Sequence, residues 1–384
     1  MLVTKLYAYA FVGEFILLYP VYSLLFLDTG LSVTEISSLF VIWSVTGMVL
    51  EVPSGAWADA VSRRLLLCLG PLLAGAGFAL WTLFPSYWAF AAGFVLWGAQ
   101  GALVSGAYEA LAYEELERLG QEHRYATVMG RAESAGVVAA AASIGLAMPV
   151  FTAGGYLAVG VASVLACVLG AALALTLPEH RTPGSATEGS YLAVLRAGIT
   201  EARTDRGVLH GVLLVSFVTA IWGALEEYVP FLGVETGVAT TTVPLLVLVV
   251  WIGVTAGGLL AGLAKGMSAR AYALTIGGAA LAMAAGAMSG HPAGFALIAV
   301  AFGAFQLAGV VADARLQERI TGPARATVTS VAGLGMNVVT LVVYTAYGAA
   351  SSGLSHGAAF AVLVAPYVLI ALLVIRPPAP SRVQ

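Results

Sequence analysis

The residues of this chain that could do chemistry are carboxylates placed inside long apolar stretches. Glu14 lies near the middle of the first stretch, and Glu226 and Glu227 lie in a later one. A charge at the centre of a bilayer costs at least about 2.5–3.5 kcal/mol, so such a residue usually faces a cavity or a partner. Because a carboxylate that is removed from water holds a proton more readily, we expect Glu14 and one of Glu226 or Glu227 to bind substrate or to carry a proton.

These carboxylates also have structural interpretations. Glu14 could form a hydrogen bond to a neighbouring helix, and Glu226 and Glu227 could belong to a solvated helix end because Pro230 follows them closely. Three amides near the middle of other apolar stretches could contact a substrate or bridge helices: Gln100, Gln306 and Asn337. Six aromatic residues could form the wall of a cavity: Tyr19, Tyr22, Trp43, Trp97, Trp222 and Tyr344.

The composition requires these residues to be placed by membrane helices. The chain has 384 residues, of which 60% are hydrophobic and 10% charged, and its mean hydropathy is +0.94. Soluble domains carry about 25% charged residues, so a water-soluble protein is excluded. Stretches of roughly 20 apolar residues are long enough to cross a hydrocarbon core of ~30 Å. We predict twelve such crossings: 6–27, 35–56, 65–84, 88–111, 125–148, 156–177, 207–228, 241–264, 271–288, 294–314, 326–348 and 356–375.

The positions of the basic residues support this count and fix the orientation. With the N-terminus inside, all 17 Lys and Arg residues fall in the inside segments and none in the outside gaps. Positive charge is retained on the cytoplasmic side, and one missed or invented crossing would scatter the charges over both sides. We therefore predict a multi-pass protein of the cytoplasmic membrane with both termini in the cytoplasm. The basic residues anchor loops and form no patch for nucleic acid.

Two related halves are predicted. Arg124-Tyr125-Ala126-Thr127-Val128 opens the fifth crossing, and the similar Arg325-Ala326-Thr327-Val328 opens the eleventh. We expect an N-terminal six-helix bundle over 1–178, a cytoplasmic linker over 179–206 and a C-terminal six-helix bundle over 207–384, as in many transporters built from repeats. Within the linker, residues 191–204 fit either a short amphipathic surface helix or a simple tether. The spacing of Gly253, Gly257, Gly258 and Gly262 predicts close helix packing.

One loop motif carries a family resemblance. Between the second and third crossings the chain reads Gly55-Ala56-Trp57-Ala58-Asp59-Ala60-Val61-Ser62-Arg63-Arg64. This resembles the G-x-x-A-D-x-x-G-R-[RK] loop of the major facilitator superfamily, except that Ser62 replaces the usual glycine and Ala60 a common basic residue. The resemblance extends over essentially the whole chain and implies an all-α membrane fold of twelve helices in two pseudo-symmetric six-helix bundles.

The same resemblance implies a cytoplasmic gate that latches the two halves. Its residues would be Gly55, Asp59, Arg63 and Arg64, with Glu109 as the partner of an arginine and the start of the eleventh crossing, near Ala326, as the partner of Asp59. A carboxylate at a helix end can accept from the exposed N–H groups of another helix, and arginines pair with carboxylates. Ordinary anchoring of the loop by Arg63 and Arg64 is the alternative.

Two other family patterns are incomplete. Gln100-Gly101 resembles the end of an R-x-x-Q-G motif, but Trp97 stands where the arginine would be. The fifth crossing has no G-P-x-x-G-G stretch, and its Pro149 lies at the outer end. The first departure puts proton coupling through that motif in doubt, and the second weakens an assignment to efflux.

We therefore predict a monomeric secondary transporter that is not an enzyme. It would move a small organic solute by alternating access, coupled to protons or another ion, and efflux of drugs or metabolites is one form of this function. No nucleotide-binding loop is present, and the five histidines show no spacing typical of metal ligands, so no cofactor or metal is expected. Membrane lipid and the solute are the expected partners. The alternatives are a polytopic enzyme acting on lipid and a transporter-like sensor that binds its ligand without flux.

Overall fold

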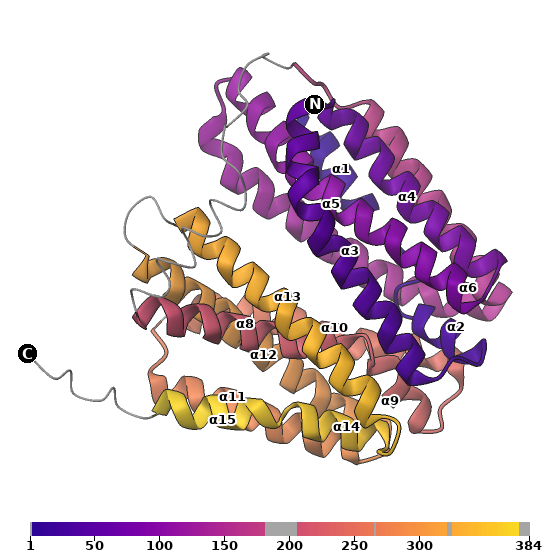
Figure 1. The fold of residues 1–384 in the computed structure, drawn as a ribbon, viewed down its shortest axis with the longest axis vertical. Helices are drawn as coiled ribbons and strands as arrows, with labels where there is room; N and C mark the ends of the chain where they lie inside the picture. The colour runs from indigo at the N-terminus through magenta and orange to yellow at the C-terminus, as the bar shows by residue number, and fades with distance from the viewer. Residues whose placement is uncertain (1, 181–205, 265, 321–324, 376–384) are drawn as a thin grey trace, which may run out of the picture. The chain divides into compact units, whose positions relative to one another are not determined.

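Helices form the regular structure of the described residues (Figure 1). The structure describes residues 2–180, 206–264, 266–320 and 325–375. For residues 52–60 and 325–327 it describes the backbone only. This computed structural model contains no strand within those ranges. A helix pairs its backbone groups within one segment, and lipid offers no other partner for them. The all-helical membrane fold is confirmed.

The described residues divide into two compact units. One comprises the residues up to His180 together with Ala239–Leu248, and the other comprises the remaining described residues. The boundaries at 178/179 and 206/207 stay predictions. Most of the predicted linker, including the possible surface helix at 191–204, lies outside the described residues.

The first unit contains most of the N-terminal half. Its elements are α1 (Leu2–Glu14), α2 (Tyr22–Asp28), α3 (Val33–Ala60), α4 (Arg63–Leu83), α5 (Tyr87–Arg118), the 3-10 turn η1 (Glu122–Arg124) and α6 (Tyr125–Leu175). The helices α3 and α4 both pack on α5, and α1 and α4 both pack on α6.

The second half begins at α8. Its elements are α8 (Arg206–Glu226), α9 (Val229–Glu235), η2 (Thr240–Thr242), α10 (Val243–Ala261), η3 (Gly262–Ala264), α11 (Ala269–Met288), α12 (Gly294–Arg319), α13 (Arg325–Ala350), α14 (His356–Leu363) and α15 (Ala365–Ile375). The helix α8 packs against α12 and α13, and α11 packs against α12, α14 and α15.

Ten helices of the described chain are long and apolar enough to cross a membrane. One of them, Glu122–Leu175, is 54 residues long and covers two predicted crossings. Non-helical backbone at Gly154 and Gly155 divides α6 into two helical parts, one for each crossing. Gly155 has a φ of +60°, a conformation that only glycine adopts without strain. The predicted first crossing is divided between α1 and α2, each too short to be counted. With both parts of α6 and the α1–α2 pair included, the helices are consistent with twelve crossings.

Aromatic rings form the core of the first unit. Trp81 lies in edge contact with Phe26 at 5.1 Å between ring centroids, and it is fully buried. Its indole N–H donates to the carbonyl of Phe90 at 3.0 Å. Gly93 makes room for this ring, since a Cβ there would lie 2.0 Å from Trp81 Nε1. Buried Tyr22 also packs in this core, 5.6 Å from Trp81, so one of the six predicted wall residues belongs to the interior of the unit.

Close backbone packing joins α10 to α12. A Cβ on Gly253 would lie 2.1 Å from the carbonyl oxygen of Ala299, and one on Gly257 would lie 1.9 Å from that of Gly303. Backbones approach this closely only through small residues. The predicted packing role is confirmed for Gly253 and Gly257.

Adding one methyl group at this crossing should separate the helices. We expect Gly257→Ala to destabilise the protein by about 1–3 kcal/mol, the usual cost of overpacking, because its Cβ would meet backbone. Gly258→Ala is the matched control, since its Cβ would make an ordinary contact at 3.7 Å with the Gln306 side chain. Thermal unfolding of the purified protein in one detergent measures both, and equal midpoints for the two variants would refute the packing interpretation.

Candidate functional site

The first crossing is broken at its centre. Residues 15–21 separate α1 from α2, whereas a continuous helix over 6–27 was predicted. Pro20 explains part of the difference, because it has no N–H to donate and disfavours helical backbone in the residue before it. The backbone N–H of Leu18 instead donates to Ser163 Oγ at 3.0 Å. Glu14 is therefore the last residue of α1 rather than a mid-helix residue.

A second carboxylate lies near Glu14. A Cβ on Gly136 of α6 would be 3.1 Å from Glu14 Cγ, so the Glu14 side chain lies over this glycine. Glu133, one turn earlier on α6, is close enough to interact electrostatically with Glu14. Sequence reasoning missed this pair, because nothing in the spacing indicates that α1 packs on α6 at Gly136.

Stacked aromatic rings follow the same break. The Tyr19 and Trp97 rings stack with centroids 5.4 Å apart and planes 17° apart, and Trp97 stacks on Trp43 at 4.6 Å and 18°. All three residues are half-buried. Trp97, which stands where the related motif has arginine, thus contributes a π face instead of a charge.

The predicted seventh crossing, 207–228, is occupied by the continuous helix α8, which is long enough to cross a membrane by itself. Glu226 is the last residue of α8, and Glu227 and Tyr228 separate it from α9. Glu226 is half-buried and forms a side-chain hydrogen bond with Trp251 of α10. Glu227 interacts electrostatically with the buried Tyr344 of α13. The first helix of each half therefore ends on a glutamate, within the predicted crossing for Glu14 and at its end for Glu226.

Two of the three predicted amides lie between packed helices. Gln100 is half-buried on α5, and its Cγ would be 3.6 Å from a Cβ on Gly70 of α4. Gln306 of α12 faces Gly258 of α10, and Asn337 is half-buried on α13. Contact of these amides with substrate stays a prediction.

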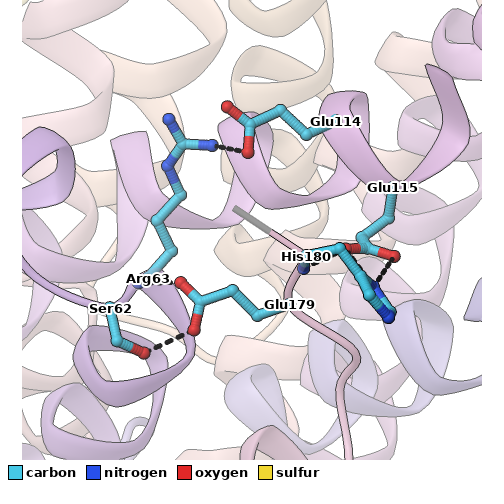
Figure 2. Close-up of polar contacts among 6 residues, drawn as sticks. All are labelled: Ser62, Arg63, Glu114, Glu115, Glu179 and His180. Atoms are coloured by element: carbon cyan, nitrogen blue, oxygen red, sulfur yellow. Dashed lines mark hydrogen bonds and ion pairs between the residues drawn. The ribbon is translucent and has the colours of Figure 1, made fainter. Parts of the chain in front are cut away.

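A polar cluster surrounds the start of α4 (Figure 2). We call it the Arg63 cluster and define it by Ser62, Arg63, Glu114, Glu115, Glu179 and His180. Ser62 caps α4 by accepting from the Leu65 N–H at 3.1 Å. Glu179, just after α6, accepts from the Arg63 backbone N–H at 2.6 Å and from Ser62 Oγ at 2.5 Å. Exposed N–H groups at a helix start favour a carboxylate there, so Glu179 fastens the end of α6 to α4.

Two glutamates of α5 complete the cluster. The Arg63 guanidinium forms an ion pair with Glu114. Glu115 is only 3% exposed, and it accepts from the His180 backbone N–H at 2.7 Å while its oxygens lie 3.1 Å from His180 Nδ1. A buried carboxylate needs such partners to offset the loss of water. Figure 2 shows Glu114 and Glu115 on the same helix, facing Arg63 and His180 respectively.

The structure places the predicted gate residues as follows. Gly55 and Asp59 lie on α3. Their side chains and that of Ala326 do not belong to the described part of the structure. Arg64 is exposed, and Arg63 pairs with Glu114. Glu109, the partner suggested by resemblance, is exposed and interacts with Tyr125. The gating role of Gly55, Asp59, Arg63, Arg64 and Glu109 stays a prediction.

Ten apolar helices of membrane-crossing length among the described residues indicate a multi-pass membrane protein. A family model described as Major Facilitator Superfamily matches residues 6–308, and the chain belongs to this family. A mutant form of the nucleoside transporter NupG has a similar structure, with a TM-score of 0.81, 11% identity, and coverage of 98% of this chain and 100% of that one.

Other solved structures show the same fold. A bacterial homologue of the human lysosomal transporter Spinster, inward-facing and unoccupied, gives a TM-score of 0.71 at 15% identity, with 98% of each chain covered. At these identities the likeness establishes the fold alone. The comparison with curated proteins gives no match.

The Arg63 cluster predicts a difference between two nearby glutamates of α5. We expect Glu115→Gln to lower the free energy of unfolding by about 1–3 kcal/mol, since the buried charged hydrogen bonds are lost. Glu117→Gln makes the same change at an exposed site, and its free energy of unfolding should stay within about 0.5 kcal/mol of that of the parent protein. Thermal or denaturant unfolding in detergent measures both variants, and an E115Q midpoint equal to that of E117Q would contradict this role.

Proposed function

We propose that the protein is a proton-coupled secondary transporter that moves a small organic solute by alternating access. The observation that carries this proposal is the position of Glu14, at the break of the first crossing and beside Glu133. Transporters bind substrates and coupling ions where membrane helices are interrupted, near the middle of the bilayer. Energy comes from an ion gradient, in which one charge crossing 100 mV carries about 2.3 kcal/mol.

The Glu14–Glu133 pair is suited to carry a proton. Both side chains are exposed, and two neighbouring carboxylates repel each other when both are charged, so a proton bound at Glu14 relieves that repulsion. Binding and release of that proton changes the charge at the break by one unit. Such a change can make one conformation more favourable than another, which is what coupling requires.

The remaining predicted residues take supporting roles in this proposal. Glu226 and Glu227 lie at the end of the corresponding helix of the second half and bind substrate or a second proton. Gln100, Gln306 and Asn337 contribute hydrogen bonds to the solute. The loop with Gly55, Asp59, Arg63 and Arg64 stabilises one conformation from the cytoplasmic side. Nucleosides serve only as one class of solute in the transport test, because the similarity to NupG establishes the fold and not the substrate.

Replacement of Glu14 tests the coupling. In proteoliposomes we expect Glu14→Gln to reduce accumulation driven by a pH gradient at least tenfold, because glutamine cannot exchange a proton. Equilibrium exchange at equal pH should persist. Labelled uridine and the dye ethidium serve as probes, with the gradient imposed in both directions to separate uptake from efflux. The exposed Glu117→Gln is the control. Gradient-driven accumulation by E14Q at the parent rate would remove Glu14 from the coupling role.

The two alternatives are tested on the same preparation. A lipid enzyme would convert phosphatidylethanolamine or phosphatidylglycerol in the liposomes, which thin-layer chromatography of the lipids measures. A sensor would bind a solute without flux. Turnover of lipid without solute movement would favour the enzyme, and saturable binding without exchange would favour the sensor.

A further inference from the structure

The second half holds an acidic site that is lined by aromatic residues. We call it the α8 site and define it by Trp222, Glu226, Glu227, Trp251 and Tyr344. Glu226 shares a hydrogen bond with the Trp251 side chain, and both glutamates interact electrostatically with Tyr344. Tyr228 adds a further ring, with its centroid 6.1 Å from that of Tyr344. Two adjacent carboxylates thus lie among aromatic side chains of α8, α10 and α13.

The basic residues of these helices lie far from the site along their axes. Arg206 begins α8, 20 residues before Glu226, which is roughly 30 Å at the rise of an α-helix. The sequence of α10 has no Lys or Arg, and Arg325 stands 19 residues before Tyr344 on α13. None of these three helices brings an arginine or lysine to the glutamates.

Titratable groups on other elements also lie near the site. The Tyr367 hydroxyl of α15 accepts from the Trp222 backbone N–H at 3.0 Å and donates to the Val218 carbonyl at 2.8 Å.

His356 and Glu235 form a separate group. His356 of α14 lies 2.9 Å from the Tyr347 hydroxyl, and the Tyr347 ring stacks on Tyr228 at 3.6 Å between centroids. Glu235 at the end of α9 accepts from the His356 and Gly357 backbone N–H groups at 3.1 and 2.9 Å. The His356–Glu235 group is therefore engaged with the start of α14, on the far side of Tyr347.

A buried hydrogen-bond donor accompanies the carboxylates. Trp222 is 8% exposed, and its indole N–H has no hydrogen-bond partner among the described residues. Trp222 and Glu226 are four residues apart on α8, a spacing that places both side chains on one face of a helix. That face meets α12, where the Trp222 ring packs against Phe302 at 5.7 Å. A buried donor without a partner destabilises the protein, and a bound ligand with an acceptor would remove this cost.

We propose that the α8 site binds an organic ammonium cation that carries a hydrogen-bond acceptor. The cation would lie against Glu226 and Glu227, and the acceptor would take the Trp222 indole N–H. This inference rests on the proposed function in one respect, namely that the bound cation belongs to the class of solute that the protein transports. Binding itself requires neither a membrane nor a gradient.

The aromatic lining favours an organic cation over a metal ion. Ring faces attract ammonium groups, and rings of Trp and Tyr commonly enclose methylated ammonium ions. A bound sodium or divalent ion needs several oxygen ligands at short distance, and the described residues include no group of three or more His, Cys, Asp or Glu that could hold a metal.

Four matched probes test the chemistry on the unmodified full chain. 4-Acetyl-N,N,N-trimethylanilinium has the cation and the acceptor, 4-ethyl-N,N,N-trimethylanilinium lacks the acceptor, 4-tert-butylacetophenone lacks the charge, and 4-acetylbenzoate reverses it. Calorimetry and thermal shift on protein in nanodiscs measure binding. We expect the acetyl cation to bind tightest, the ethyl cation about fivefold more weakly, and the neutral and anionic probes at least tenfold more weakly.

Variants assign the binding to the site. Glu226→Gln and Glu227→Gln should each lower the affinity for the acetyl cation about tenfold. Glu318→Gln, a change at an exposed site in the same half, should leave this affinity unchanged. Trp222→Phe removes the N–H and should abolish the preference for acetyl over ethyl. Trp88→Phe is its control, since Trp88 is 79% exposed. If a variant does not fold, the comparison of the four probes on the unmodified protein still tests the proposal.

Several outcomes would overturn the proposal. Equal binding of the neutral and cationic probes would exclude the cation, and unchanged cation binding by E226Q and E227Q would place it elsewhere. An acetyl-over-ethyl preference that survives W222F would exclude the donor role. Stabilisation by sodium chloride with no response to any organic cation would identify a sodium site. Binding that depends on Glu226 together with failed gradient-driven transport would refute the proposed function and leave this site intact.

Discussion

The structure depends on one constraint, the absence of hydrogen-bond partners for the backbone within a bilayer. Each N–H and C=O in the hydrocarbon core must be paired inside the protein, so a break in a crossing helix persists only where another group replaces the lost partner. At the first break, Ser163 Oγ accepts from the Leu18 N–H. The helix end at Glu14 is therefore a supported interruption, held in place by α6.

This constraint also explains where the carboxylates lie. A charged side chain on a continuous, lipid-facing helix would be expensive, whereas an interrupted helix is tolerated only where protein or water surrounds it. Glu14 ends α1 before such an interruption, and Glu226 ends α8 at the end of its crossing. Each has a neighbour that a lipid-facing residue would lack, Glu133 for the first and Trp251 for the second. The recurring feature of the two halves is thus a glutamate at the end of the first helix.

Hydropathy and the distribution of Lys and Arg were enough to predict the fold class, because both follow from the bilayer alone. The spacing of Gly253 and Gly257 was enough to predict a close helix crossing, though not its partner on α12. The break at residues 15–21 was missed, since its support comes from Ser163, which lies 145 residues further on. The role of Glu179 was missed for the same reason, as its contacts with Ser62 and Arg63 span more than 100 residues. Periodicity within one segment carries no information on such pairings.

The Arg63 cluster bears on how a conformational change could proceed. Its contacts join the start of α4, the end of α5 and the residues after α6, all within one unit. These contacts therefore join helix ends of the same unit and involve no residue of the other. A latch that differs between conformations must instead use groups whose partners lie in the other half, as the resemblance implies for Asp59. Arg63 would then serve to fix the loop that presents Asp59, because its backbone N–H and its guanidinium are both engaged by glutamates of its own unit.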